Sequence, residues 1–215
     1  MTAITIDLVS DIACPWCAIG YGRLQQALNT LPQIEATLTW RAFELNPDPD
    51  AQPEPIVPAL CRKYNTTKEQ IDASQQQMMA IAADLGLNFE KMESRYTTNT
   101  FDAHRLVKWA HQFDKQTAMK QALFDAYFGE ARSIQDQEVL LDCVEQAGLD
   151  HEKARQVLNG DDFADQVRQE EQQYQQAGVT SVPAFVINQK YLISGAQEPQ
   201  QLAQALTQIA EEDNA

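Results

Sequence analysis

Two cysteines separated by two residues are the feature of this 215-residue chain whose spacing could do chemistry. They form the segment Cys14-Pro15-Trp16-Cys17, which follows a predicted strand and begins a predicted helix. In that context, a pair with this spacing indicates a dithiol that cycles to a disulfide. The unpaired N–H groups and the positive dipole end of the helix stabilise a thiolate at the first cysteine. We therefore expect Cys14 to be the exposed nucleophile and Cys17 to be the shielded resolving thiol.

A metal site, a pair of core residues and a structural disulfide are the alternatives to redox chemistry. A zinc site would need a second close cysteine pair or histidines at ligand spacing, which His104, His111 and His151 do not provide. Two cysteines that only fill a core would not need proline and tryptophan between them. A structural disulfide is disfavoured in a reducing compartment. The sequence therefore favours a redox-active pair and no metal, and it predicts that Cys61 and Cys143, in apolar stripes, are buried and inert.

The elements that position the pair follow from the spacing of apolar residues. Alternation at Ile4, Ile6 and Leu8 predicts a strand before the pair, and residues 34–43 are typical of a second strand. A strand, a short helix and a strand form a βαβ unit, whose strands are parallel and whose crossover is right-handed. The segment 46–58 contains five prolines and predicts an extended connection that leaves the sheet.

Beyond this connection the apolar spacing is helical, with four amphipathic stripes before Gly148. A hairpin and a last helix are expected after Gly178, so a βαβ half and an α-ββα half would flank a block of helices. The later elements are predicted at 152–158 and 161–177 (helices), 183–187 and 191–193 (hairpin) and 199–212 (helix).

A second candidate feature is Val182-Pro183, which lies directly before a predicted strand. Proline suits the start of a strand because it has no N–H to give to the ladder. Taken alone, the segment is typical of an ordinary trans proline that opens an edge strand, since only about 5% of X-Pro bonds are cis. The dithiol elsewhere in the chain favours the cis alternative.

Together these features resemble the DsbA-type branch of the thioredoxin superfamily. The similarity is greatest to the FrnE-like dithiol oxidoreductases, which are related to kappa-class glutathione transferases and 2-hydroxychromene-2-carboxylate isomerases. It covers nearly the whole chain and includes residues 99–105 and 193–197. The resemblance implies an α/β thioredoxin fold, with βαβ and then ββα around a central mixed sheet and a large all-helical insertion.

The resemblance also implies a domain organisation. Residues 1–45 and 178–215 would form the thioredoxin-like domain, and residues 59–160 the helical insertion domain. Residues 161–177 would form the long helix that joins the two.

Roles for several residues follow from the same resemblance. Pro183 would be the cis-proline that faces Cys14, and the Val182 backbone would pair with an extended substrate segment. Pro15 and Trp16 would contact the substrate. Because Trp16 stands where DsbA itself has histidine, the resemblance does not imply a strongly oxidising dithiol.

Residues Asn99, Thr100 and His104 match a motif that lines the active-site cleft of the glutathione-dependent relatives. The resemblance implies substrate binding by Asn99 and His104. Two structural alternatives stay open. Asn99 or Thr100 could cap the helix that begins near Phe101, and His104 could be a hydrogen-bonded structural histidine.

Composition limits the partners of the protein. Acidic residues outnumber basic ones 31 to 16, which leaves a formal charge of −15 and disfavours nucleic acids and anionic membrane surfaces. The first residues lack the basic and apolar regions of an export signal, and no apolar run is long enough to cross a bilayer. We therefore expect a cytoplasmic protein, a monomer or a homodimer.

Three functions compete. The first is a cytoplasmic thiol-disulfide oxidoreductase or isomerase that acts on thiol- or disulfide-containing proteins or peptides. It would hold no bound cofactor, although glutathione could act as co-substrate. The second is a glutathione-dependent isomerase or transferase for a small aromatic or polyketide-like compound, but such relatives typically have serine in place of Cys14. The third is a non-enzymatic, chaperone-like binding protein.

Overall fold

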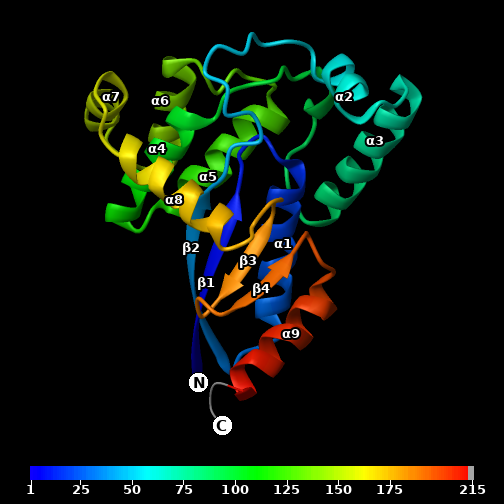
Figure 1. Cartoon of the computed structure of the whole chain (residues 1–215), viewed down its shortest axis with the longest axis vertical. Coiled ribbons are helices and arrows are strands. Elements are labelled where there is room, and N and C mark those ends of the chain that lie inside the picture. Colours follow the sequence, from blue (N-terminus) through cyan, green and yellow to red (C-terminus); the bar gives the residue numbers. More distant parts are fainter. Residues whose placement is uncertain (213–215) are drawn as a thin grey trace.

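A four-stranded mixed sheet lies at the centre of the computed structural model, which describes residues 1–212 (Figure 1). Its strands follow the order β2-β1-β3-β4. The strands are β1 (Thr2–Ser10), β2 (Ile34–Ala42), β3 (Ala184–Ile187) and β4 (Tyr191–Ser194).

The first two strands and the helix between them form the expected βαβ unit. Helix α1 (Pro15–Asn29) connects β1 to β2, and these two strands are parallel, as predicted. Strand β3 joins the other side of β1 in antiparallel register, so that Leu8 is opposite both Trp40 and Phe185. Because β1 is central, its carboxyl end at Ser10 brings the dithiol segment to the middle of the sheet edge.

The remaining helices are arranged in two groups. Helix α9 packs against α1, and α8 packs against β2. The others gather beyond the carboxyl end of β1 (Figure 1). The bounds of all helices after α1 are α2 (Ile56–Tyr64), α3 (Lys68–Asp84), η1 (Met92–Ser94), α4 (Phe101–Ala110), η2 (His111–Phe113), α5 (Gln116–Phe124), η3 (Asp125–Gly129), α6 (Gln137–Gln146), α7 (His151–Asn159), α8 (Ala164–Gln176) and α9 (Pro199–Glu212).

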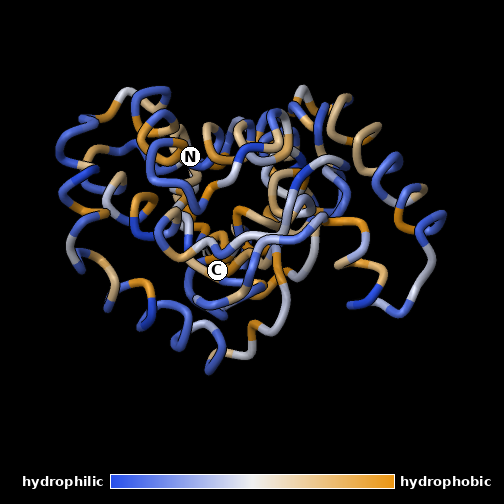
Figure 2. The backbone as a smooth tube through the Cα atoms, turned by 90° about the horizontal axis from the view of Figure 1, so that it is seen from above, coloured by the Kyte–Doolittle hydropathy of each residue, from blue (hydrophilic) through white to orange (hydrophobic). Residues whose placement is uncertain are grey.

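One continuous hydrophobic core joins the sheet to the inserted helices. Trp40 of β2 packs on Tyr21 of α1 and on Phe124 of α5, with ring centroids 5.0 and 6.2 Å apart. Seen from above, the hydrophobic parts of the backbone gather towards the middle and the hydrophilic parts lie outside (Figure 2). The α/β thioredoxin fold with a helical insertion is therefore confirmed.

Several predicted boundaries differ from the structure. The second strand ends at Ala42 and not at Phe43. Helix α2 begins at Ile56, inside the segment predicted to be extended, because Pro58 falls in the first turn of a helix, where proline is tolerated. Residues 213–215 of the predicted range 178–215 lie outside the described residues.

The prediction that Cys61 is buried is wrong, because this side chain is half-buried. Helix α2 is short and buries only Ile56. Among the described residues, its main packing partners are α3 and η1, so most of its surface stays open. Cys143 is buried, as predicted, and burial raises the pKa of its thiol to about 12.

Gly20 lies where α1 passes the segment that precedes β3. A Cβ atom at Gly20 would lie 3.0 Å from Pro183 Cγ and 3.3 Å from Phe185 Cζ, whereas one at Gly22 would meet the flexible end of Leu85. We expect Gly20→Ala to unfold in urea with a free energy about 1–3 kcal/mol lower than that of Gly22→Ala, because only the first substitution overpacks the core. Equal stability of the two variants would contradict this close approach.

Candidate active site

The dithiol begins helix α1, as its sequence predicts. Cys14 is the N-cap residue and Pro15 occupies the first turn. The Cys14 N–H donates to Asp11 O at 3.3 Å, and the Cys17 N–H donates to Cys14 O at 3.0 Å. The first turn carries no acidic side chain, so nothing in it offsets the positive end of the helix dipole. The structure thus places Cys14 at the helix start on which its predicted reactivity depends.

The segment before β3 contacts the dithiol, although 168 residues of sequence separate Val182 from Cys14. Cys14 Sγ donates to Val182 O at 3.7 Å, and the Val182–Pro183 peptide bond is cis. The Gly195 N–H donates to Pro183 O at 2.8 Å and fixes this segment to the end of β4. The structure therefore brings Cys14, Cys17 and Val182-Pro183 together.

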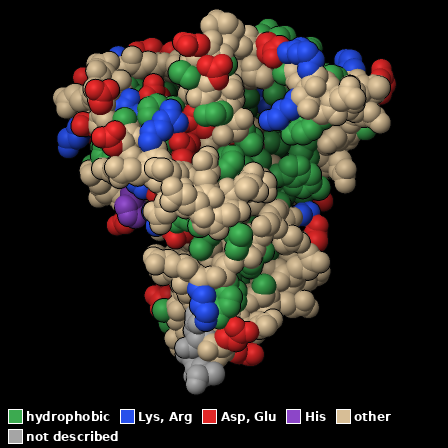
Figure 3. Space-filling model, in the orientation of Figure 1, with side chains coloured by type: hydrophobic (Ala, Val, Ile, Leu, Met, Phe, Trp, Pro, Cys, Tyr) green, Lys and Arg blue, Asp and Glu red, His purple; other side chains and the backbone are tan. Residues whose placement is uncertain are grey.

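Cys14 is less accessible than the sequence predicts. Its exposed fraction is 5% and that of Cys17 is 0%, so Cys14 is the more accessible sulfur but not an exposed one. The sulfur belongs to the hydrophobic core cluster and contacts the Val182 carbonyl. Trp16 between the two cysteines is 37% exposed. Hydrophobic side chains gather on the face of the molecule shown in Figure 3, at the height where α1 begins.

His104 acts on the loop before the dithiol through Asp11. Its Nε2 lies 3.1 Å from Phe43 O and 3.4 Å from Asp11 Oδ1, so it carries the hydrogen that these two acceptors share. Burial opposes ionisation of Asp11, but hydrogen bonding to His104 and to the Leu45 N–H holds the pKa of this carboxyl below its ordinary value. Within residues 1–212, His104 makes no hydrogen bond to a cysteine sulfur.

Asn99 is held by the backbone and by a buried carboxylate. Its Oδ1 accepts from the Phe101 N–H at 2.9 Å, which satisfies one free N–H at the start of α4. Its Nδ2 donates to Glu44 Oε2 at 3.2 Å and to Asn46 O at 3.1 Å. These contacts give Asn99 a capping function and direct it toward the β2–α2 connection.

Two buried cations that interact with the cysteines were not identified from the sequence. Lys120 of α5 is fully buried and interacts electrostatically with Cys17, Asp11 and Cys14. Arg95, in the loop before α4, is also buried and interacts electrostatically with Cys14. A lysine among the apolar residues of a helix stripe is a signal that could have identified Lys120, whereas Arg95 lies in a loop without periodicity.

The two sulfurs differ in chemistry because of their depth. Burial raises the pKa of the Cys17 thiol well above its ordinary value, the neighbouring Cys14 sulfur adds to this effect, and Lys120 opposes it. Both cysteines are free thiols in the structure. Such a pair has one sulfur near solvent and a second that reaches its thiolate form only with help from its surroundings.

The family of the chain follows from comparison with known proteins. A family model described as the DSBA-like thioredoxin domain matches residues 5–207. The chain belongs to this family. DSBA-like proteins of known structure include a probable DsbA oxidoreductase from Streptomyces coelicolor, which is 36% identical, with a TM-score of 0.90 over 95% of this chain and 89% of that one.

Two more distant structures share the DSBA-like fold. The cytosolic disulfide reductase DsbM from Pseudomonas aeruginosa, solved with GSH, has a TM-score of 0.64 at 18% identity, covering 95% of this chain and 98% of that one. A 2-hydroxychromene-2-carboxylate isomerase has a TM-score of 0.70 at 13% identity and covers 98% of each chain. The resemblance to the DsbA-type branch is thereby confirmed.

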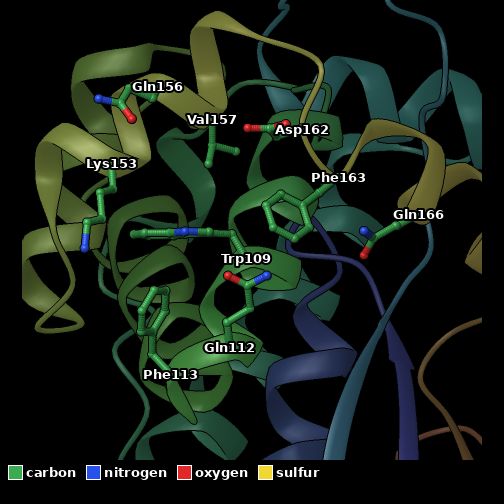
Figure 4. Close-up of a pocket in the computed structure, with 9 residues that line it drawn as sticks. All are labelled: Trp109, Gln112, Phe113, Lys153, Gln156, Val157, Asp162, Phe163 and Gln166. Atoms are coloured by element: carbon green, nitrogen blue, oxygen red, sulfur yellow. The ribbon is translucent and has the colours of Figure 1, made fainter.

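Further candidate sites in this DSBA-like chain carry less chemistry. Among residues 1–212, no cluster of three or more His, Cys, Asp or Glu side chains could hold a metal ion, and no helix is long and apolar enough to span a membrane. A hollow of about 430 Å³ lies between α4, η2, α7 and the start of α8, with Trp109 and Phe163 pointing into it (Figure 4). None of its lining residues belongs to the predicted site.

The two interpretations of His104 predict different results for two substitutions. His104→Leu removes the donor to Phe43 O and Asp11, and we expect a loss of about 1–3 kcal/mol in the free energy of unfolding. His104→Gln can donate from its amide nitrogen, so we expect it to keep most of that stability and its exchange activity. Urea unfolding and exchange assays of both variants measure this. Loss of activity in a fully stable His104→Gln would instead show a direct chemical role.

Proposed function

We propose that this DSBA-like chain is a cytoplasmic thiol-disulfide oxidoreductase or isomerase of the FrnE type, with Cys14 as nucleophile. One observation carries the proposal. The Cys14 sulfur lies at the start of a helix and 3.7 Å from Val182 O, the carbonyl that directly precedes Pro183. A helix start favours the thiolate, which is the form that attacks a disulfide.

The proposed reaction has two steps. The Cys14 thiolate attacks one sulfur of a substrate disulfide, and the other substrate sulfur leaves with the bonding electron pair and takes up a proton. The Cys17 thiol then loses its proton and attacks Cys14, which releases the second substrate sulfur and leaves a Cys14–Cys17 disulfide. Run in reverse, the same steps oxidise a substrate dithiol. The position of Cys17, one turn beyond Cys14, supports its role as resolving thiol.

The proposed substrates are proteins or peptides in extended conformation. The Val182 N–H has no hydrogen-bond partner within the part of the chain that the structure describes. A substrate strand could pair with it, as in β-strand addition, with Pro183 beside the reacting sulfurs. The exposed Trp16 ring and the adjacent Pro15 supply apolar contacts for the residues that flank the substrate cysteine. Asn99 would not contact the substrate in this proposal, and it would act only by holding the β2–α2 connection in place.

Glutathione is the proposed co-substrate that exchanges with the dithiol between turnovers. The neighbouring fold of DsbM, a cytosolic disulfide reductase solved with GSH, supports both this co-substrate and a cytoplasmic location. The proposed chemistry needs no metal or bound cofactor, because the two sulfurs carry the electron pair.

Equilibration with glutathione tests the proposed function. The purified protein is incubated in buffers with graded ratios of reduced to oxidised glutathione, the free thiols are blocked in acid, and the masses are measured. We expect an intramolecular disulfide between Cys14 and Cys17. The ratio of dithiol to disulfide protein should be proportional to the squared concentration of reduced glutathione divided by the concentration of oxidised glutathione. The same protein should accelerate the reduction of insulin by dithiothreitol.

Two outcomes would contradict the proposal. If Cys14 and Cys17 stay reduced across all buffers, the pair is not a redox dithiol. If glutathione binds tightly but no intramolecular disulfide forms and insulin reduction is not accelerated, the chain is better assigned as a glutathione-dependent isomerase or transferase.

A further inference from the structure

Lys120 has an unusual environment for a charged side chain. It lies in the middle of α5 and has no exposed surface. Its neighbours at positions i−4, i+3 and i+4 on this helix, Gln116, Leu123 and Phe124, are also buried. Removal of an ammonium group from water costs several kcal/mol unless a partner compensates. Packing alone therefore does not account for a lysine at this position.

The immediate surroundings of the ammonium compensate this cost only in part. Lys120 Nζ lies 5.1 Å from the centre of the Trp40 ring and 5.3 Å from that of Phe124. Contacts with aromatic faces contribute about 0.5–2 kcal/mol. Within residues 1–212, Nζ has no hydrogen-bond acceptor. An anion nearby is therefore needed to keep the side chain charged.

Three groups that can carry negative charge interact electrostatically with Lys120, and two of them, the sulfurs, change during the reaction. These groups are Cys17, Asp11 and Cys14. The Asp11 carboxylate already accepts from the Ala13 and Leu45 N–H groups and lies against a histidine, so its charge is fixed. The sulfurs are anionic only as thiolates and become neutral in a disulfide.

We infer that Lys120 is the internal counter-charge of the Cys14–Cys17 dithiol, protonated while a thiolate is present and deprotonated once the disulfide has formed. The inference rests on the proposed function, because it assigns the proton balance of the same exchange reaction. Lys120 is accordingly a positioning residue for charge and does not form a bond with the substrate.

With this role, atoms and charges balance without a proton from outside. The reduced site holds a Cys14 thiolate, a Cys17 thiol and a Lys120 ammonium. Two electrons pass to the substrate disulfide as the Cys14–Cys17 bond forms. The two leaving sulfurs need two protons, and these come from the Cys17 thiol and the Lys120 ammonium. The oxidised site then holds a disulfide and a neutral amine, which hydrocarbon surroundings tolerate.

The electrostatics of the site agree with this role. With both cysteines reduced, burial lowers the pKa of Lys120 to about 8, while Cys17, Asp11 and Cys14 oppose this shift. Loss of the proposed Cys14 thiolate removes part of the opposition, so the pKa of Lys120 should fall further in the disulfide form. A group that is mainly charged in one redox state and mainly neutral in the other, near pH 7, couples proton release to oxidation.

Two further ionisable groups near the dithiol, Arg95 and Cys143, keep a constant charge near pH 7, whereas Glu44, whose pKa burial raises to about 7, acts on Asp11. Arg95 acts on Cys14 and stays a cation. Cys143 of α6 packs against α5 through Ala122 O, and burial raises its pKa to about 12, so it stays neutral. His104 of α4 faces Asp11, and β2 contributes the uncharged Trp40. The redox-dependent change is therefore expected at Lys120.

Nuclear magnetic resonance of the protein with ¹³C at the lysine Cε positions tests the inference directly. The Lys120 signal is assigned from its absence in Lys120→Met, which replaces a buried charge by an apolar side chain of similar length and should fold. Wild-type protein is titrated with base in the dithiol and disulfide forms. We expect the apparent pKa of Lys120 to be lower by about one unit or more in the disulfide form. The same apparent pKa in both forms would overturn the inference.

The equilibrium constant with glutathione, measured against pH, gives a second readout. Near neutral pH, wild type should take up about one more proton per disulfide reduced than Lys120→Arg, whose side chain stays charged in both redox states. Lys115→Met, at an exposed lysine just before the same helix, should match wild type. Identical pH profiles of wild type and Lys120→Arg would contradict the role of Lys120. Failure of the proposed function is distinct, since then no Cys14–Cys17 disulfide forms in any of these proteins.

Discussion

Cys14→Ser is expected to reduce insulin reduction and glutathione exchange to the uncatalysed background, and Cys17→Ala to stop the reaction after its first step. Without Cys14 there is no attacking sulfur, and we expect turnover to fall by roughly 10³-fold or more. Without Cys17 the mixed disulfide cannot be resolved internally. Cys17→Ala should therefore accumulate a covalent adduct with a substrate peptide or with glutathione, which non-reducing electrophoresis and intact mass measure.

Matched controls separate loss of chemistry from loss of structure. Serine is a favourable N-cap residue, so Cys14→Ser should fold at least as stably as wild type. Cys143→Ala removes a sulfur that is as deeply buried as that of Cys17, and it should keep full turnover. Cys61→Ala removes a half-buried sulfur and should also keep full turnover. Equal turnover of wild type and Cys14→Ser would refute the assignment of the nucleophile.

Arg105→Met is expected to lower the free energy of unfolding by about 3–5 kcal/mol, which is the largest effect on stability that we predict. The Arg105 guanidinium is buried and donates to the carbonyl oxygens of Val157, Gly160 and Asp162, which end α7 and lead into α8. Methionine fills a similar volume but leaves these oxygens without their donors. The melting temperature should fall by roughly 10 °C.

Arg155→Met is the control for this prediction. Arg155 is a partly exposed arginine of α7 that pairs with Glu138 at 3.0 Å. Exposed pairs of this kind contribute less than about 1 kcal/mol. Calorimetry of the two variants should therefore separate them clearly. If the melting temperature falls as little for Arg105→Met as for Arg155→Met, water replaces the guanidinium without a loss of stability.

Much of the fold could be predicted because its signals are local. The alternation of Ile4, Ile6 and Leu8 and the proline after Cys14 mark the strand and helix starts, and both are found where expected. Boundaries were less predictable at residues whose conformation depends on tertiary packing. Phe163, for example, adopts a positive φ of 65° before α8, so that helix begins later than its apolar pattern indicates.

The candidate site was predictable only in part. Cys14 and Cys17 are neighbours in sequence, and their spacing alone indicates their chemistry. Several side chains around them come from distant segments, as Lys120 and Arg95 do, and their importance depends on burial and charge that one sequence does not display. The burial of Cys14, whose sulfur contacts the Val182 carbonyl, was missed for the same reason.

The distance of 168 residues between Cys14 and Val182 has a consequence for biosynthesis. During translation, the two cysteines leave the ribosome long before the segment that completes their surroundings. The inserted helices that carry the internal cation also emerge later than the pair. A nascent chain therefore presents two ordinary thiols, and the reactive centre is assembled only after Val182 has left the ribosome. Stalled or truncated products would lack the reactivity of the mature protein.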